Sequence, residues 1–334
     1  MKACHFRSRA RTALPAALFV FASGAAAAAD SGRDAGNYPA RPVRMIVPYA
    51  PGGGADTLAR YIGQALGESF GQSFVIDNRG GGGTIIGSEL AAKSPPDGYS
   101  IIMVASTHAV VSSLYKSLPY DPIRDFTPVV RVASAPNILV LHPSLAAASV
   151  KELVALARAK PGELIFASSG NGGGSHLAME LFRSMTRIEM VHVPYKGTGP
   201  AMIDLLAGQA KLMFGGMIGT VTHVRSGRLR AIAISSAVRS SITPEVPTVA
   251  ESGYPEYEAT TWYGMLAPAK TPAAIVQALN NRSAAVLKDA KLLSRIHAQG
   301  ADASVNTPEQ FAAYIRSEQV KWAKVVKESG AKPE

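Results

Sequence analysis

The sequence predicts an α/β protein of two lobes, each a mainly parallel β-sheet flanked by helices, with a ligand cleft between the lobes. Three observations lead to this prediction. Short apolar segments alternate with amphipathic segments, which is typical of βαβ units. Several apolar segments run directly into glycine-rich loops, and open α/β sheets bind ligands at the edge where such loops lie. The 334 residues also suffice for two domains.

The first βα unit, residues 43–66, shows these features most clearly. An apolar β-prone run ends at Pro48, and three glycines follow at residues 52–54. Apolar residues then recur at helical spacing, and Asp56 can cap this helix. A helix that begins after a glycine turn directs unpaired N–H groups at the turn. The turn is therefore either an anion site or only a tight connection, and the residues leave both open.

Two further units complete the first half of the chain. A predicted strand at residues 73–78 leads into glycines at residues 80–83 and a short helix at residues 84–93. The next strand, residues 100–105, is almost continuously apolar, which is typical of a parallel strand buried on both faces. Two hydroxyl residues, 106–107, follow at its carboxyl end.

The second lobe is predicted to repeat this pattern. Two β-prone segments, residues 126–135 and 138–141, are separated by Pro136 and Asn137, where we place the crossing between lobes. A capping box, S-x-x-E, opens a helix at Ser149. Polar or glycine-rich loops again follow predicted strands, at residues 168–175, 194–197 and 215–216.

The end of the chain is predicted to return to the first lobe. Residues 257–266 are β-prone and contain Trp262, and a T-x-x-Q pattern at residues 307–310 starts a final helix. That helix carries Phe311 and Trp322 and is expected to close the first domain. The predicted domains are residues 30–136 with 260–334, and residues 137–259.

Residues 1–29 are predicted to be a signal peptide. They hold four basic residues, an apolar core and a run of small residues. The apolar core is shorter than the roughly 20 residues of a membrane span, so export to the periplasm is expected. Cys4, the single cysteine, lies in this segment, so the mature chain has no disulfide. Without these residues the net charge of +10 falls to near +6.

Several functional classes are disfavoured by the motifs. No glycine run continues as a Walker phosphate loop or fits the G-x-G-x-x-G register. A G-x-S-x-G motif around Ser69 lies between a predicted helix and a strand, the reverse of a nucleophile elbow. The histidines lack metal-site spacing and the basic residues are dispersed, so no cofactor, metal or nucleic acid is expected. His108, His176, Lys196 and Trp262 fit either a structural role or a ligand contact.

The chain resembles the periplasmic solute-binding proteins of tripartite tricarboxylate transporters, the Bug or TctC-like family. The resemblance rests on motifs in the expected order: VRMIVPYAPGGGAD, DNRGGGGTIIG, LPYDPIRDFTPV, ASSGNGGGSHLAMELF and HVPYKGTGPAMIDLLAG. It implies a two-lobed periplasmic-binding-protein-like fold, a bound organic carboxylate, delivery to membrane permease subunits, a monomer and no catalysis. Backbone amides, hydroxyls and ordered water of the glycine loops would bind the carboxylate.

The resemblance also implies a set of binding residues. Asp56 is the member that a capping role alone explains. The implied ligand-binding residues are Tyr49, Ala50, Gly52, Gly53, Asp56, Ser106, Thr107, Ser168, Ser169, Gly170, Asn171, His176, Tyr195, Lys196, Gly215 and Gly216.

Three positions depart from the family pattern and bear on the ligand. Ala55 and Ile85 stand where polar residues are common, and Gly80 stands where proline is common. Fewer polar side chains near these loops favour a more apolar acid over a citrate-like one. Two alternatives stay open: an exported hydrolase that uses Ser169 with His176, and a ligand-sensing partner of a membrane kinase.

Overall fold

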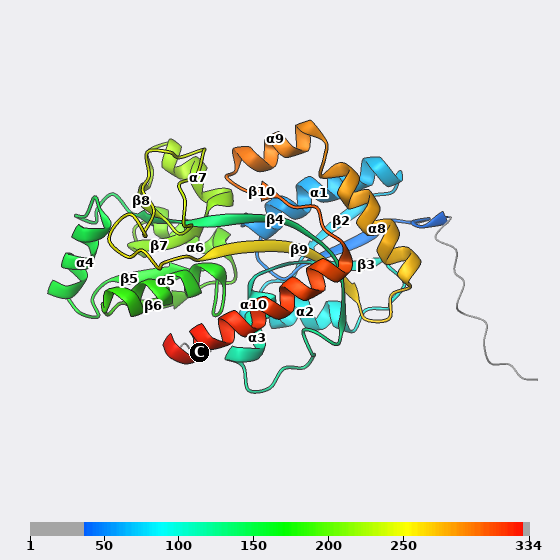
Figure 1. The fold of residues 1–334 in the computed structure, drawn as a ribbon, viewed down its shortest axis with the longest axis horizontal. Coiled ribbons are helices and arrows are strands. Elements are labelled where there is room, and N and C mark those ends of the chain that lie inside the picture. The colour runs from blue at the N-terminus through cyan, green and yellow to red at the C-terminus, as the bar shows by residue number, and fades with distance from the viewer. Residues whose placement is uncertain (1–36, 330–334) are drawn as a thin grey trace, which may run out of the picture. The chain divides into compact units, whose positions relative to one another are not determined.

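A computed structural model describes residues 37–329 of the chain. The expected signal peptide lies outside these residues. Within them the chain forms two β-sheets that share one long strand, β4 (Phe126–Leu141). Figure 1 shows β4 and β9 (Thr260–Pro268) running side by side through the middle of this region.

The first sheet is built around three parallel strands, β2 (Phe74–Asn78), β1 (Val43–Val47) and β3 (Ser100–Ala105). β9 extends this sheet antiparallel to β3, and β4 lies antiparallel to β9. The short strand β10 (Asp302–Ala303) pairs with β4.

Both faces of the first sheet are buried, as expected for residues 100–105. Met45 and Met103 pack with α1 (Gly54–Phe70) on one face. Ile46 and Val104 point to the other face, into a cluster with Trp262. Successive residues of a strand point to opposite faces, so a strand covered on both sides must be apolar throughout. The helices of this half also include α2 (Ile85–Ala92), α3 (Thr107–Leu114), α8 (Ala273–Val286) and α9 (Ala290–Ala298), with the short helix η2 (Gly82–Thr84).

The second sheet contains β7 (Leu212–Gly216), β5 (Ile165–Ser168) and β6 (Val191–Pro194), which are parallel to one another. The last part of β4 pairs antiparallel with β7 and with β8 (Arg230–Ile234). The helices of this half are α4 (Val150–Ala159), α5 (Gly174–Thr186), α6 (Thr198–Leu206) and α7 (Met217–Arg225).

The segment between the sheets differs in detail from the sequence prediction. Two separate β-prone runs were expected, whereas β4 is continuous across Pro136 and Asn137. Its partners change at this point: Pro136 is opposite Thr260 of β9, and Asn137 is opposite Gly216 of β7. A strand can tolerate a proline where it passes from one set of partners to another. The exact domain boundaries stay a prediction.

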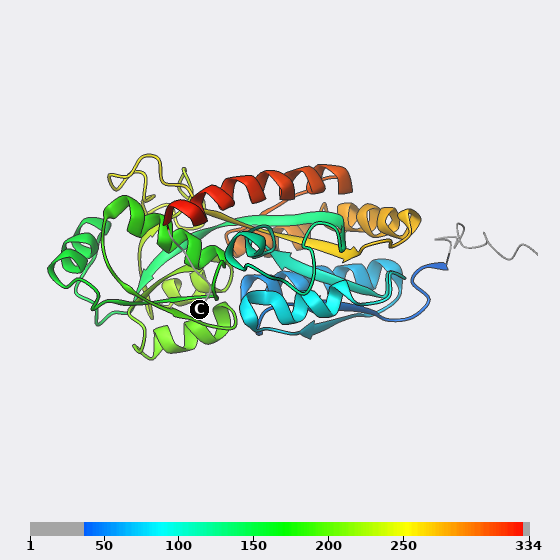
Figure 2. The same ribbon diagram turned by 90° about the horizontal axis from the view of Figure 1, so that it is seen from below.

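The final helix, α10 (Pro308–Ser329), lies over β4 and extends toward α5 (Figures 1 and 2). Phe311 packs beside Trp262 near the first sheet, whereas Trp322 packs in the core of the second sheet. Glu318, which is 7% exposed, accepts hydrogen bonds from the indole nitrogens of Trp262 and Trp322 at 3.1 and 2.9 Å. The helix therefore contributes to both cores, in addition to its expected place on the first.

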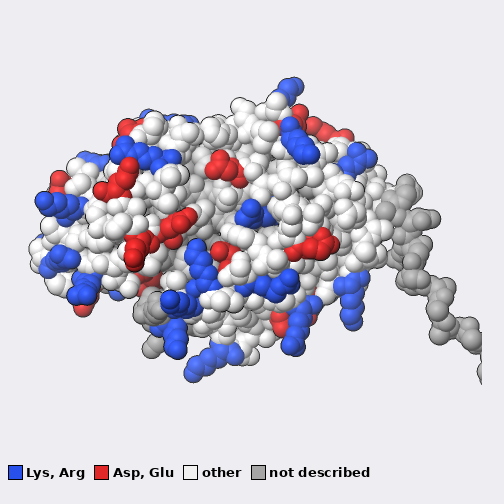
Figure 3. Space-filling model, viewed as in Figure 1, with Lys and Arg blue, Asp and Glu red and all other residues white. Residues whose placement is uncertain are grey.

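No helix among residues 37–329 has the length and apolarity that crossing a membrane requires. Lys and Arg are intermixed with Asp and Glu on the face that Figure 3 shows. This mixture agrees with the dispersed charges of the sequence.

Candidate ligand-binding site

Asp56 stabilises the loop after β1 by hydrogen bonds. The carboxylate of Asp56 accepts the Gly52 N–H at 3.0 Å and a bond from the Asn78 amide at 3.0 Å, and it pairs with Arg60 at 2.9 Å. Burial raises the pKa of Asp56, but the hydrogen bonds from Arg60, Gly52 and Asn78 outweigh it and hold the pKa below its usual value. Asp56 lies in the first turn of α1 and Gly53 is the N-cap, so the expected capping position is wrong.

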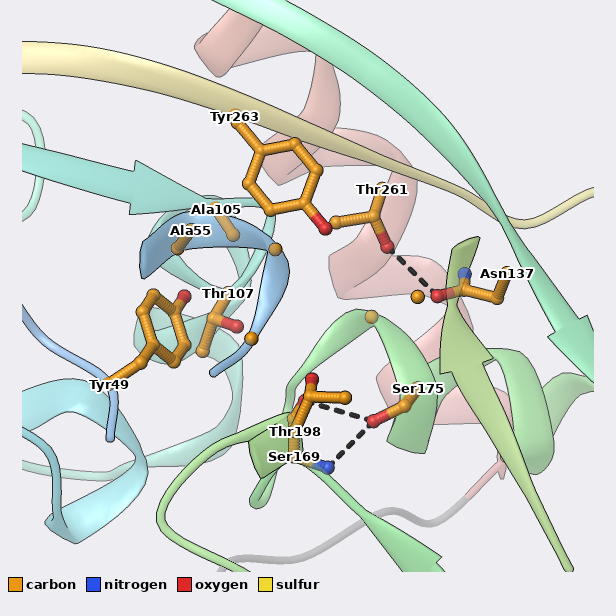
Figure 4. A pocket seen from close by; sticks show the side chains of 14 residues that line it. Tyr49, Ala55, Ala105, Thr107, Asn137, Ser169, Ser175, Thr198, Thr261 and Tyr263 are labelled. Carbon is orange, nitrogen blue, oxygen red and sulfur yellow. Dashed lines mark hydrogen bonds between the residues drawn. The ribbon is translucent and has the colours of Figure 1, made fainter. Parts of the chain in front are cut away.

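Beyond this loop lies a small cavity, which we call the inner chamber (Figure 4). It has about 30 Å³ of space for the centre of a water molecule. None of its lining side chains is charged. They are Tyr49, Gly53, Gly54, Ala55, Ala105, Thr107, Asn137, Ser169, Gly174, Ser175, Thr198, Gly216, Thr261 and Tyr263.

Helix N-termini converge on the inner chamber. The helices α1, α3, α5 and α6 begin at or directly beside lining residues, and α7 begins after Gly216. The first N–H groups of a helix have no partner in the helix, and its N-terminus carries a partial positive charge. The chamber therefore offers several positive dipole ends without a cationic side chain, which suits an anion.

Hydroxyl and amide groups complete the wall. Ser175 Oγ accepts the Ser169 N–H at 2.7 Å and lies 2.9 Å from Ser169 Oγ, while Thr261 Oγ1 donates to Asn137 Oδ1 at 3.3 Å (Figure 4). Burial raises the pKa of Tyr49 to about 12, and burial also raises the pKa of Tyr263. These phenols therefore stay neutral at physiological pH and can donate hydrogen bonds.

Two buried hydroxyls near the chamber have no hydrogen-bond partner among residues 37–329. They are Ser106 Oγ, on a residue that is 1% exposed, and Thr220 Oγ1, on a residue that is 0% exposed. A Cβ built on the lining residue Gly174 would lie 3.3 Å from Ser106 Oγ, so this hydroxyl borders the chamber wall. A buried polar group without a partner costs about 1–3 kcal/mol.

Two glycines admit the close packing around the chamber. A Cβ on Gly54 would overlap with the Tyr263 hydroxyl, and a Cβ on Gly174 would overlap with Thr261 Oγ1. The absence of side chains there lets the starts of α1 and α5 approach β9. Glycine is needed at these two positions because a side chain would overlap with neighbouring atoms, and not because of an unusual backbone conformation.

A second cavity, the outer chamber, shares the lining residues Tyr49 and Ser169 with the inner one. Its volume is about 690 Å³. Across its wall the Ala50 N–H donates to Lys196 O at 2.8 Å, joining the loop after β1 to the loop after β6. The lining residues are Pro48, Tyr49, Ala50, Gly81, Gly82, Gly83, Thr84, Tyr115, Ser169, Gly170, Asn171, Pro194, Tyr195, Lys196 and Pro200.

The structure brings most of the expected binding residues to these two cavities. Those at the inner chamber are Tyr49, Gly53, Thr107, Ser169 and Gly216, and those at the outer chamber are Tyr49, Ala50, Ser169, Gly170, Asn171, Tyr195 and Lys196. The expected residues that line neither cavity are Gly52, Asp56, Ser106, Ser168, His176 and Gly215.

Sequence reasoning missed lining residues on β4 and β9. Asn137 was read only as part of the crossing, and Thr261 and Tyr263 belong to a strand far along the chain. No local motif marks these three residues. Ser175 and Gly174, in contrast, lie at the end of the polar loop that was singled out, so that loop was the available signal for them.

Ser168 and His176 flank the loop between β5 and α5: Ser168 ends β5, and His176 lies in the first turn of α5. The His176 ring stacks on His192 with centroids 4.1 Å apart, and His176 Nδ1 accepts the Gly172 N–H at 3.1 Å. Ser168 Oγ lies 2.6 Å from His192 Nε2 but is 0% exposed. Ser169 bonds to Ser175 and not to His176, so the nucleophile–base pair of the hydrolase alternative does not form.

The described residues contain no cluster of three or more histidine, cysteine or acidic side chains placed to hold a metal ion. The fold and the cavity between its two halves define the class of protein, an α/β solute-binding protein. That class agrees with comparisons to known proteins.

A model of the tripartite tricarboxylate transporter family receptor, TctC, matches residues 58–331. BugT of Bordetella pertussis is 41% identical over 323 residues, which are 96% of this chain and 98% of BugT. A structure of an R. palustris protein with adipate superposes with a TM-score of 0.87 at 38% identity, covering 89% of this chain and all of that one. The periplasmic binding protein BugD superposes with a TM-score of 0.86 at 34% identity, with the same coverage of 89% and 100%.

The chain therefore belongs to the family of tripartite tricarboxylate transporter receptors. This confirms the resemblance, the two-lobed fold and the expectation of a receptor rather than an enzyme. The family comprises periplasmic binding proteins.

Proposed function

We propose that this protein captures a small organic carboxylate between its two lobes and delivers it to the membrane permease subunits of a tripartite tricarboxylate-type transporter. One observation carries the proposal: an uncharged cavity, rich in hydroxyl donors, lies where several helices begin. A single carboxylate there would receive hydrogen bonds and the favourable field of the dipoles. The protein with adipate provides a precedent for an acid ligand in this fold.

The lobes in this proposal are residues 30–136 with 260–334, and residues 137–259. The change of partners along β4 at Pro136 and Asn137 supports this division. The bond between Ala50 and Lys196 supports a closed form in which loops of both lobes meet over the ligand. Export by cleavage after residue 29, and action as a monomer, are parts of the same proposal.

The test is a thermal-shift screen of the mature chain with acetate, malate, adipate, citrate and benzoate, followed by calorimetry on the hits. We expect at least one acid to bind, and at about 100 times its Kd it should raise the free energy of unfolding by about 2.7 kcal/mol. No turnover of an ester panel is expected. If none of the acids binds, the proposal is overturned.

A matched pair of glycine variants locates the site. Gly53→Leu places a side chain against Thr198, because even a Cβ at Gly53 would lie 3.3 Å from Thr198 Cβ. We expect it to abolish binding while the protein stays folded. Gly67→Ala lies on the same helix, where its Cβ would make an ordinary contact at 3.4 Å with Gln72 O, and it should bind normally. Unchanged affinity in Gly53→Leu would refute the assignment of this loop.

A further inference from the structure

Tyr263 places a buried phenol at the inner chamber. It lies on β9 opposite Ala105 of β3 and Ala133 of β4, so its backbone is held in the sheet from both sides. The residue is 4% exposed and lines the chamber. Figure 4 shows its ring reaching from β9 toward the other lining residues, with the hydroxyl at the far end. A side chain fixed in this way presents its hydroxyl at a defined point of the chamber wall.

The Tyr263 hydroxyl is available to a molecule in the chamber. It has no hydrogen-bond partner among residues 37–329. It also differs from Ser106 Oγ and Thr220 Oγ1, which lack a partner but are fully enclosed by the protein. A buried hydroxyl that faces a cavity and has no partner is suited to donate a hydrogen bond to a ligand in that cavity.

The same hydroxyl lies beside the backbone of both proposed lobes. A Cβ on Gly54, the first residue of α1, would overlap with it, and a Cβ on Gly216, at the end of β7, would lie 3.4 Å from it. The N-terminus of α1 carries a partial positive charge, which attracts the hydroxyl oxygen and favours a hydrogen that points away from the helix. This orientation suits donation to an anionic oxygen in the chamber.

The Tyr263 hydroxyl also limits the size of the acid group that can enter. The chamber has about 30 Å³ of space for water centres, and one water needs roughly 10–15 Å³, so about two oxygen-sized groups fit. A carboxylate has two oxygens in one plane with its carbon, whereas a sulfonate has three oxygens around a tetrahedral sulfur. The substitution Tyr263→Phe would remove the hydroxyl oxygen and so add space for about one further oxygen.

We propose that Tyr263 determines the specificity of the inner chamber for planar acid groups. Its hydroxyl donates to one oxygen of a carboxylate and occupies the space that the third oxygen of a sulfonate would need. The protein therefore selects carboxylates over sulfonates that have the same carbon chain. This inference rests on the proposed function, because it requires an acid group in the inner chamber.

Calorimetry on the mature protein with matched acids tests the inference. The pairs are acetate with methanesulfonate, adipate with butane-1,4-disulfonate, and benzoate with benzenesulfonate; the members of each pair differ only in the acid group and carry the same charge at pH 7. We expect each carboxylate that binds to bind at least about tenfold more tightly than its sulfonate, because the third oxygen does not fit.

Tyr263→Phe should reduce this preference. Carboxylate affinity should fall about tenfold, as expected for the loss of a hydrogen bond to a charged group, while sulfonate affinity should stay the same or rise. Malate and citrate should also bind about tenfold more weakly to this variant. Because the Tyr263 hydroxyl has no internal hydrogen bond to lose, the melting temperature of the ligand-free protein should not fall.

Tyr257→Phe is the matched control. The Tyr257 hydroxyl is buried, donates to Ala178 O at 2.7 Å and lines neither chamber. Its loss should lower the melting temperature but leave the ratio of carboxylate to sulfonate affinity unchanged. A merely structural role of Tyr263 would weaken both members of a pair equally, so the ratio separates a structural role from a specificity-determining one.

The failures of the two proposals differ. If a sulfonate binds as tightly as its carboxylate, or if Tyr263→Phe leaves the ratio unchanged, the inference is overturned while the proposed function stands. If only malate or citrate binds and Tyr263→Phe leaves that affinity unchanged, the inference is likewise overturned. If no carboxylate binds, the proposed function fails, and the inference fails with it.

Discussion

His176 and His192 stack at an angle of 7° directly behind the loop that presents Ser169 and Ser175 to the inner chamber. Each ring holds a different part of that loop. His176 Nδ1 accepts the Gly172 N–H, and His192 Nε2 lies within hydrogen-bond distance of Ser168 Oγ, which in turn accepts the Gly170 N–H at 3.1 Å. Both nitrogens can act as acceptors only while they carry no proton.

The histidine pair predicts acid sensitivity. Burial, assisted by Arg183, lowers the pKa of His176 to about 4, and burial, assisted by His176 and Arg183, lowers the pKa of His192 to about 3. The unfolded chain takes up these protons near pH 6.5, so the folded state loses stability as the pH falls below about 6.5 toward 4, by up to about 1.4 kcal/mol per pH unit for each ring. Urea unfolding at several pH values measures this slope.

His176→Asn is the control for this prediction. The amide oxygen of this asparagine can still accept the Gly172 N–H but does not titrate. The slope of the unfolding free energy against pH between about pH 6.5 and 4 should therefore decrease by the equivalent of about one bound proton, while carboxylate binding persists. A stability that does not change over that interval in the original protein would contradict the prediction.

Gly199 is predicted to permit closure of the cleft. A Cβ on Gly199 would overlap with the Pro51 carbonyl of the facing loop, so Gly199→Val should hold the two loops apart and break the bond between Ala50 and Lys196. Affinity for a bound acid should fall by about tenfold or more, because closure completes the ligand's contacts. Calorimetry measures the affinity and small-angle scattering measures compaction.

Ile203→Ala on the same helix is the matched control for Gly199. Ile203 is 67% exposed, so its truncation should leave both affinity and ligand-induced compaction unchanged. Compaction of Gly199→Val to the same extent as the original protein would rule out this role for Gly199.

Glu318 is predicted to be critical for stability because it satisfies two indole nitrogens. Glu318→Ala leaves the N–H groups of Trp262 and Trp322 buried without an acceptor, at about 1–3 kcal/mol each. We expect the free energy of unfolding to fall by about 2–5 kcal/mol in urea titrations. Glu318→Gln keeps an amide oxygen as acceptor and should recover most of the loss, and equal losses in the two variants would contradict this explanation.

Asp56 is predicted to support binding without touching the ligand. Asp56→Ala removes the acceptor of the Gly52 N–H and of the Asn78 amide, so the loop before α1 should become less ordered and the affinity for carboxylates should fall. The expected loss of stability is about 2 kcal/mol, because two buried bonds are lost. Amide hydrogen exchange at residues 50–54 measures the order of the loop.

A variant of Arg60 is the matched control for Asp56→Ala. Arg60→Ala removes an exposed partner of Asp56 and leaves its bonds to Gly52 and Asn78, so loop exchange should change little. If Asp56→Ala weakened binding but left loop exchange as it was, a direct ligand contact would replace this interpretation.

The sequence did not specify the order of strands in the sheets, whereas it did mark several of the loops that border the two cavities. Glycine-rich and hydroxyl-rich segments after strands were visible as letters, and Tyr49, Gly53, Thr107, Ser169 and Gly216 do line the inner chamber. Gly52, Ser168 and His176 belong to the same segments but are not among the residues that line the cavities. The direction of a side chain within an irregular loop depends on its packing partners, which have no local signature.

The sequence by itself determined the alternation of strands and helices, the glycine turns before helices and the apolar strands buried on both faces, because these follow from local spacing and propensity. Tertiary structure alone decided that Asn137 of β4 and Thr261 and Tyr263 of β9 close the chamber opposite Tyr49. It also decided that His176 supports a loop and that Glu318 joins two tryptophans. These roles arise from contacts between residues far apart along the chain, which no local pattern encodes.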